Sequence, residues 1–220
     1  MTRIKEILLA EKYLKLLRAG RLVKEEDLIR ALNLKWFRLC ALYYIKDKNG
    51  KKVRFKPNAA QRKFYVRGHN RDLILKARQL GFTTFKMVSS LDSCCFIPNF
   101  SAGCIAQDLS TAKDIYRNKI IFAYEQIDRA WLRTFKRLKL AFPIPVSDTD
   151  MSYVFSNGSS IQVSTSYRGG TLQDLHISEF GKICAKTPEK AREIVTGAFE
   201  AVGDNNSITI ESTAEGREGY

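Results

Sequence analysis

"DLILKARQLGFTTFKMV", residues 72–88, is the stretch that decides the fold. It begins with a short apolar run that predicts a strand, passes through a glycine-containing loop and continues as a helix from Thr83. A loop between a strand and a helix directs backbone N–H groups and the positive end of the helix dipole toward an anion. The stretch therefore predicts a phosphate-binding loop at the end of a strand.

The loop departs from the usual phosphate-loop pattern G-x-x-x-x-G-K-[ST] in its charged positions. Gly81 and Thr83 fit the second glycine and the hydroxyl, but Lys76 replaces the first glycine and Phe82 replaces the lysine. Lys76 at the strand end and Arg78 inside the loop can supply the positive charge from other directions. A strand–turn–helix with one glycine is common, so these residues alone leave a purely structural turn as the alternative.

The rest of the chain alternates strands with helices. The expected strands are 72–77, 101–107, 151–155, 160–165, 171–178 and 207–213, and the expected helices are 83–97, 110–127 and 187–202. Ser110 opens one helix, Pro188 lies in the first turn of another, and Asn157-Gly158 marks a hairpin. The alternation predicts an α/β domain with a mainly parallel sheet.

The N-terminal part has a different pattern. Residues 2–20 and 24–33 have helical periodicity, Asn49-Gly50 indicates a hairpin within 41–55, and 57–68 restarts as a helix. We therefore expect a small basic helical and hairpin region over residues 1–56, followed by the main domain over 57–220.

Charge is distributed unevenly along the sequence. The net charge is +14, but residues 1–80 hold 22 Lys and Arg against 7 Asp and Glu, whereas residues 81–220 hold 15 against 16. A basic excess confined to one region favours a polyanionic partner such as DNA or RNA over a merely solvated surface.

The five cysteines and the apolar runs place the chain among reduced, non-membrane proteins. The cysteines show no CxxC or Cys/His ligand spacing, so we expect buried thiols and no zinc site. No run of 18 apolar residues occurs, and the charged N-terminus lacks a signal-peptide core. We expect cytoplasmic residence.

Three further features of the sequence suggest nucleotide chemistry. An apolar strand ends in Ser178-Glu179, which places a carboxylate where a metal-associated or water-activating group is needed; a surface acid is the alternative. The last strand ends in Ser212-Thr213 before Gly216, which suits either phosphate contact or simple turn chemistry. Gln61 carries an amide that can read an adenine edge, although a surface glutamine is the simpler interpretation.

Four segments in this order resemble the ATPase half of the large terminase subunit, the DNA-packaging motor of tailed bacteriophages. They are YYIKDKNGKKVRFKPNAAQRKFY, KARQLGFTT, STSYRGGTLQDLHISEFGK and ITIESTAEG, within residues 41–220. The resemblance implies a three-layer P-loop NTPase domain of the ASCE, RecA-like class, with variant Walker A and Walker B motifs and a small helical N-terminal subregion. The first 40 residues match nothing clearly.

The resemblance also implies roles for the matched positions. Glu179 would be the catalytic carboxylate, Arg78 would stabilise transition-state charge, and Thr83 would bind Mg²⁺, with Ser178 as a weak metal contact. Ser212, Thr213 and Gly216 would couple hydrolysis to movement. The implied ATP-binding residues are Gln61, Lys76, Ala77, Arg78, Gln79, Leu80, Gly81, Phe82, Thr83 and Thr84.

On the same basis the partners would be double-stranded DNA, the portal protein and the small terminase subunit, in the cytoplasm of an infected bacterium and without a membrane. The family forms a ring on the portal, whereas a fragment could be monomeric. Because the family's nuclease domain normally follows the ATPase, we expect a chain ending at Tyr220 to be a fragment without nuclease activity.

Two other classes remain open. A helicase-type ATPase also joins a phosphate loop to nucleic acid, although it normally brings a second motor domain. A basic DNA-binding module that has lost ATP would bind DNA with a steep salt dependence and would not bind Mg-ATP.

Overall fold

The computed structural model describes residues 1–149, 151–167 and 170–214. The chain forms two compact units. The helical unit comprises Met1–Arg67 and Ile121–Phe142, and the sheet unit comprises Gly68–Ile120 and Pro143–Tyr220.

The helical unit combines short helices with one hairpin. Its elements are α1 (Arg3–Arg18), α2 (Glu25–Leu32), α3 (Lys35–Ala41), β1 (Tyr44–Lys46), β2 (Lys52–Arg54), α4 (Ala59–Arg67), α7 (Phe122–Glu125) and α8 (Arg129–Arg137). The predicted hairpin at Asn49-Gly50 is confirmed, since β1 and β2 pair antiparallel. Trp131 of α8 joins the later segment to α3: its indole donates to the Ala41 carbonyl at 3.1 Å, and its ring meets Phe37 edge-on at 6.2 Å between centroids.

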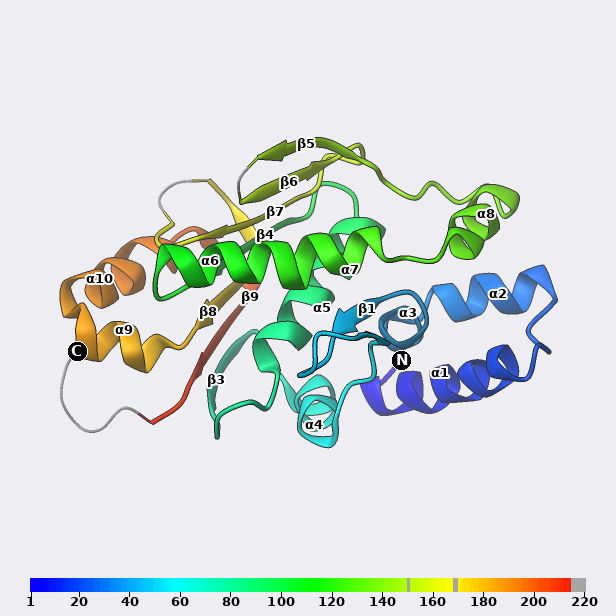
Figure 1. The fold of residues 1–220 in the computed structure, drawn as a ribbon, viewed down its shortest axis with the longest axis horizontal. Helices are drawn as coiled ribbons and strands as arrows, with labels where there is room; N and C mark the ends of the chain where they lie inside the picture. Colours follow the sequence, from blue (N-terminus) through cyan, green and yellow to red (C-terminus); the bar gives the residue numbers. More distant parts are fainter. Residues whose placement is uncertain (150, 168–169, 215–220) are drawn as a thin grey trace. The chain divides into compact units, whose positions relative to one another are not determined.

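The sheet unit is built on a seven-stranded sheet in the described residues, with strand order β3-β9-β8-β4-β7-β6-β5 (Figure 1). The strands are β3 (Arg71–Leu75), β4 (Ser101–Ile105), β5 (Pro145–Thr149), β6 (Ser152–Phe155), β7 (Ser160–Ser164), β8 (Leu172–Ser178) and β9 (Val202–Ser212). Neighbours from β3 to β7 in this order are parallel, and β6 and β5 continue antiparallel. The predicted mainly parallel α/β sheet is thus confirmed, and β3 lies at its edge.

Helices connect these strands and cover the sheet. They are α5 (Phe82–Phe96), α6 (Leu109–Ile115), the π-helix η1 (Tyr116–Ile121), α9 (Phe180–Lys186), α10 (Pro188–Glu193) and the π-helix η2 (Ile194–Ala198). The helix predicted to start at Ser110 starts one residue earlier, at Leu109. Asp108 is its N-cap and accepts a hydrogen bond from the Thr111 backbone N–H at 2.7 Å. No helix among the described residues is both long and apolar enough to cross a membrane.

The alternation of side chains along β8 separates the two faces of the sheet. Leu175 and Ile177 join an apolar cluster that includes Ile183 of α9 and Ile194 of η2. Asp174, by contrast, bonds to α5 through Lys86 at 2.9 Å. Because strand side chains alternate, Asp174 and Ser178 share the face of β8 that contacts α5.

All five cysteines, Cys40, Cys94, Cys95, Cys104 and Cys184, are buried and free, as predicted. Burial raises the pKa of the Cys40 thiol to about 12, so this thiol is neutral at physiological pH.

Candidate active site

The loop between β3 and α5 turns on two left-handed residues. Gln79 has φ 65° and Gly81, the N-cap of α5, has φ 68°. Glycine adopts this conformation without the steric cost that a side chain brings, which explains its place directly before the helix. The Phe82 ring is buried, whereas Arg78 is exposed on the loop.

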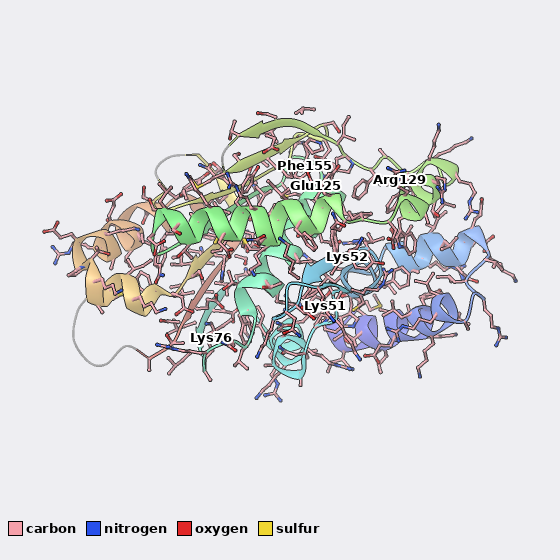
Figure 2. All side chains as sticks on the ribbon, in the orientation of Figure 1. Lys51, Lys52, Lys76, Glu125, Arg129 and Phe155 are labelled. Atoms are coloured by element: carbon pink, nitrogen blue, oxygen red, sulfur yellow. The ribbon has the colours of Figure 1, made fainter. Side chains whose placement is uncertain are left out.

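Lys76, which is labelled in Figure 2, directly follows β3. It forms an ion pair with Glu179, which directly follows β8. Its backbone N–H donates to the Ser212 carbonyl at 2.9 Å, which fixes the loop to the end of β9. Its Nζ lies 2.7 Å from Glu179 Oε1, and the two side chains are only 6% and 20% exposed. The cation at the start of the loop and the carboxylate at the end of β8 therefore form one site.

Glu179 is held in an unusual backbone conformation. Its φ is 56° and its ψ is 46°, in the left-handed region that costs a non-glycine residue about 1 kcal/mol. Thr213 donates to its second oxygen at 3.1 Å, and Lys182 Nζ lies 3.7 Å away. Such strain is retained where surrounding contacts hold a side chain in place.

The surroundings of Glu179 also set its protonation. Burial acts to raise the pKa of this carboxyl, but the hydrogen bond and charge of Lys76, with Thr213 and Lys182, hold its pKa below the ordinary value. Glu179 is therefore ionised at neutral pH.

A second set of contacts surrounds Thr83 in the first turn of α5. The Thr83 hydroxyl lies 3.3 Å from the Ser178 hydroxyl and donates to Glu211 Oε1. Ser178 in turn donates to the same Glu211 oxygen at 3.2 Å. The start of α5 and the end of β8 thus each bring one hydroxyl to the buried carboxylate near the end of β9.

Glu211 is fully buried on β9. His176 Nε2 lies 3.4 Å from Glu211 Oε1, close enough for an electrostatic interaction although the geometry is outside the limits of an ordinary hydrogen bond. Burial acts to raise the pKa of Glu211, but His176, Thr83 and the charge of Lys76 outweigh it and hold the pKa below its ordinary value. Within the described residues, Glu211 Oε2 has no hydrogen-bond partner.

No protein-family model and no curated protein matches the sequence. The HK97 bacteriophage large terminase superposes with a TM-score of 0.53 and 13% identity, over 79% of this chain and 36% of its own. This chain shares its fold with a bacteriophage large terminase.

Two structures from a Thermus phage match as well. The P74-26 large terminase ATPase domain has 16% identity over 84% of this chain and 70% of its own, with a TM-score of 0.46. A mutant form of that domain covers the same shares with a TM-score of 0.45. The chain spans only about a third of the HK97 terminase, so the activity of a whole terminase is not carried over with the fold.

The terminase fold brings several of the candidate residues together and leaves others apart. Ser212 lies on the α9 side of β9, where its hydroxyl accepts from the Gly181 N–H at 2.9 Å. The neighbouring Thr213 contacts Glu179 as described above. Ala77 and Gln79 are exposed, Leu80 and Thr84 are half-buried, and Gly216 lies outside the described residues.

Gln61 belongs to the helical unit and has a local role there. Its side-chain oxygen accepts from the Asn58 N–H at 3.0 Å, while the Asn58 side chain accepts from the Gln61 N–H at 3.0 Å. This reciprocal pair is a capping box at the start of α4. The adenine-reading role stays a prediction.

Glu211 is the residue that sequence reasoning missed. Its signal is an acid that directly follows Ile208-Thr209-Ile210 and stands immediately before Ser212-Thr213. A charged residue in such a strand is rarely buried without a partner.

The site also fits a magnesium ion. No group of three or more His, Cys, Asp or Glu that could hold a metal occurs in the described part of the chain. Mg²⁺ at nucleotide sites needs fewer protein ligands, because phosphates and water complete its shell. The Thr83 hydroxyl and the unpartnered buried oxygen of Glu211 are suitable oxygen donors.

Proposed function

We propose that this chain is the ATPase motor of a phage DNA-packaging terminase, hydrolysing ATP to drive double-stranded DNA into a procapsid. The observation that carries the proposal is the ion pair between Lys76, at the start of the loop, and Glu179, at the end of β8. A loop cation and a strand-end carboxylate beside a helix N-terminus are the groups that ATP hydrolysis requires. The terminase fold supports the same function.

ATP binding would use the loop and the positive end of α5. The β- and γ-phosphates would draw the Lys76 ammonium away from Glu179, because the phosphates carry more negative charge. Arg78, exposed on the loop, would neutralise charge that develops on the γ-phosphate. Thr83 would hold Mg²⁺, which supplies charge neutralisation between the phosphates when bound.

Hydrolysis would then use Glu179. Loss of the Lys76 contact removes the main interaction that lowers the pKa of this carboxyl, so its basicity rises when nucleotide is bound. Glu179 would accept a proton from the attacking water as the new oxygen–phosphorus bond forms and the bond to ADP breaks. Until nucleotide binds, the ion pair with Lys76 would keep the basicity of Glu179 low.

Coupling would run through the end of β9. Thr213 donates to Glu179, and Ser212 accepts from the Gly181 N–H of α9. A change in the contacts of Glu179 would therefore reach adjacent residues of β9 and, through Ser212, the first turn of α9.

DNA would be the partner of the basic helical unit. That unit holds 24 Lys and Arg against 8 Asp and Glu, a net charge of +16, whereas the sheet unit has a net charge of −2. Figure 2 labels two of these cations, Lys51 and Lys52, on the hairpin. The proposed protein partners are the portal protein, the small terminase subunit and further copies of this chain in a ring. The proposed location is the cytoplasm of an infected bacterium.

The same charge favours a second candidate, a basic DNA-binding module that does not hydrolyse ATP. It would use the helical unit alone and would leave Lys76 paired with Glu179 as a structural ion pair. A helicase-like ATPase is the other alternative and would share the nucleotide site.

The deciding experiment is calorimetric titration of Mg-ATP into the wild type and Lys76→Ala, followed by phosphate release with and without double-stranded DNA. We expect binding by the wild type, loss of binding and hydrolysis in Lys76→Ala, and stimulation by DNA. Lys186→Ala, an exposed lysine at the end of α9, is the matched control and should behave as wild type. Full hydrolysis by folded Lys76→Ala would overturn the assignment, and DNA binding without any Mg-ATP binding would favour the DNA-binding module.

A further inference from the structure

Position 178 lacks the carboxylate that a magnesium site of this kind usually has. P-loop NTPases commonly hold Mg²⁺ with the loop hydroxyl and an aspartate at the end of a neighbouring strand. Here that strand ends in Ser178, whose hydroxyl is neutral. The charge that balances the cation must come from another position.

The pairing of β8 with β9 identifies that position. The two strands are parallel, and Ser178 is directly paired with Glu211. Paired residues on neighbouring strands lie on the same face about 5 Å apart. Glutamate is one methylene longer than aspartate, so its carboxylate can reach sideways toward the site from the adjacent strand.

The contacts of Glu211 fit this role. The Thr83 hydroxyl donates its proton to Glu211 Oε1, which leaves the lone pairs of that hydroxyl available to a cation. Ser178 donates to the same oxygen from the other strand. Glu211 is 0% exposed, and its second oxygen has no partner among the described residues. A buried ionised oxygen without a partner is costly, and a nearby cation would remove that cost.

We propose that Glu211 is the carboxylate of the Mg²⁺ site, serving in place of the acid that is absent at position 178. It would hold the Thr83 hydroxyl in its metal-binding orientation and supply the negative charge beside the cation. This inference rests on the proposed nucleotide site.

The test measures how much Mg²⁺ strengthens nucleotide binding, rather than activity. A fluorescent ADP analogue is titrated in Mg²⁺ and in EDTA against the wild type, Glu211→Gln and the control Glu189→Gln, an exposed residue of α10. We expect Glu211→Gln to bind in EDTA like the wild type and to lose about tenfold or more of the gain from Mg²⁺. Glu189→Gln should keep the full gain.

A second variant moves the carboxylate from β9 to the end of β8. It tests whether a carboxylate at either place can serve the metal, and it covers the case in which Glu211→Gln folds poorly. In Ser178→Asp/Glu211→Gln we expect the Mg²⁺ gain to return. Electron paramagnetic resonance of Mn²⁺ with ADP should show the same order of metal affinity: weakened in Glu211→Gln and restored in the double variant.

The outcomes separate this inference from the proposed function. If the wild type gains affinity from Mg²⁺ and folded Glu211→Gln keeps that gain, Glu211 is not the metal's carboxylate although the nucleotide site stands. Equal loss of binding with and without Mg²⁺ in both variants would also overturn the inference, since it indicates a structural role. A wild type that binds no nucleotide would overturn the proposed function and this inference together.

Discussion

Phe82 occupies the position at which the usual phosphate loop has its lysine, yet the site still contains a lysine at another position. The usual lysine position is here the first residue of α5, and the ring that occupies it is only 5% exposed. A lysine whose side chain took the buried position of this ring would lose the hydration of its charged end. The ammonium instead comes from Lys76, which is tied to β9 through its backbone N–H.

We therefore expect Phe82→Leu to keep most ATP hydrolysis and to cost about 1 kcal/mol of unfolding free energy, because it changes packing but not charge. Phosphate release and urea unfolding measure the two effects. Lys76→Ala is the comparison that removes the charge. If folded Phe82→Leu were as inactive as Lys76→Ala, the ring itself would be needed for catalysis.

The Lys76–Glu179 pair also makes stability depend on pH. The pKa of Glu179 is lowered in the folded chain, so the pair contributes stability above the ordinary value of 4.5 and loses it as pH falls through the folded pKa. We expect the difference in unfolding free energy between the wild type and Lys76→Met to be constant near neutral pH and to shrink as pH falls below 4.5. Urea unfolding from pH 7 downward measures it, and a difference that grew on acidification would contradict this origin of the pKa shift.

At the scale of elements, a buried ionic cluster joins α5 to β8 and β9. Asp174 accepts from Lys86 at 2.9 Å, from Ser90 at 2.5 Å and from Ser207 at 2.8 Å. Burial acts to raise the pKa of Asp174, but these donors, Lys86 first, hold it below the ordinary value. Lys86 lies one helical turn after Thr83, so the cluster keeps the start of α5 seated against the ends of the strands.

Lys86→Met should destabilise the chain by about 3 to 5 kcal/mol, because it leaves a buried carboxylate without its counter-charge. The double variant Lys86→Met/Asp174→Asn removes both charges and should lose much less than the two single variants combined. Urea unfolding at neutral pH gives these values. The matched control is Arg30→Met, which breaks an exposed pair with Glu26 and should change stability very little. Strictly additive losses would mean that Lys86 and Asp174 do not stabilise each other.

Local signals were enough to predict many of these elements. The hairpin at Asn157-Gly158 joins β6 to β7, and the strand expected at 171–178 is β8, because turn chemistry and apolar runs act over a few residues. The return of Ile121–Phe142 to the helical unit was not predicted, since it depends on packing such as that of Trp131. Glu211 was missed for the same reason: its partners follow from the pairing of β8 with β9, which no local pattern encodes.

At the scale of the whole chain, charge divides the molecule into a basic helical unit and a nearly neutral sheet unit. Binding to double-stranded DNA should weaken steeply with salt, because lysines and arginines release counterions from the phosphates. Lys48→Gln/Lys51→Gln, two exposed lysines at the hairpin turn, should make the slope of log affinity against log salt shallower by up to about 2.

Fluorescence anisotropy with a short duplex at several salt concentrations measures that slope. The control is Arg117→Gln/Lys186→Gln, which removes two exposed charges from the sheet unit and should leave the slope unchanged. Equal effects of the two double variants would mean that DNA responds to total charge and does not prefer the helical unit.

The place of β3 at the edge of the sheet has a consequence for how the protein behaves in concentrated solution. In the described residues β3 pairs only with β9, and its outer row of backbone donors and acceptors faces away from the sheet. Leu73 and Leu75 are 76% and 74% exposed on this strand. A hydrophobic edge strand is a ready template for strands from other copies, so self-association should begin at the strand that leads into the nucleotide loop. Colloidal stability would then depend on the five residues that immediately precede the loop proposed to bind nucleotide.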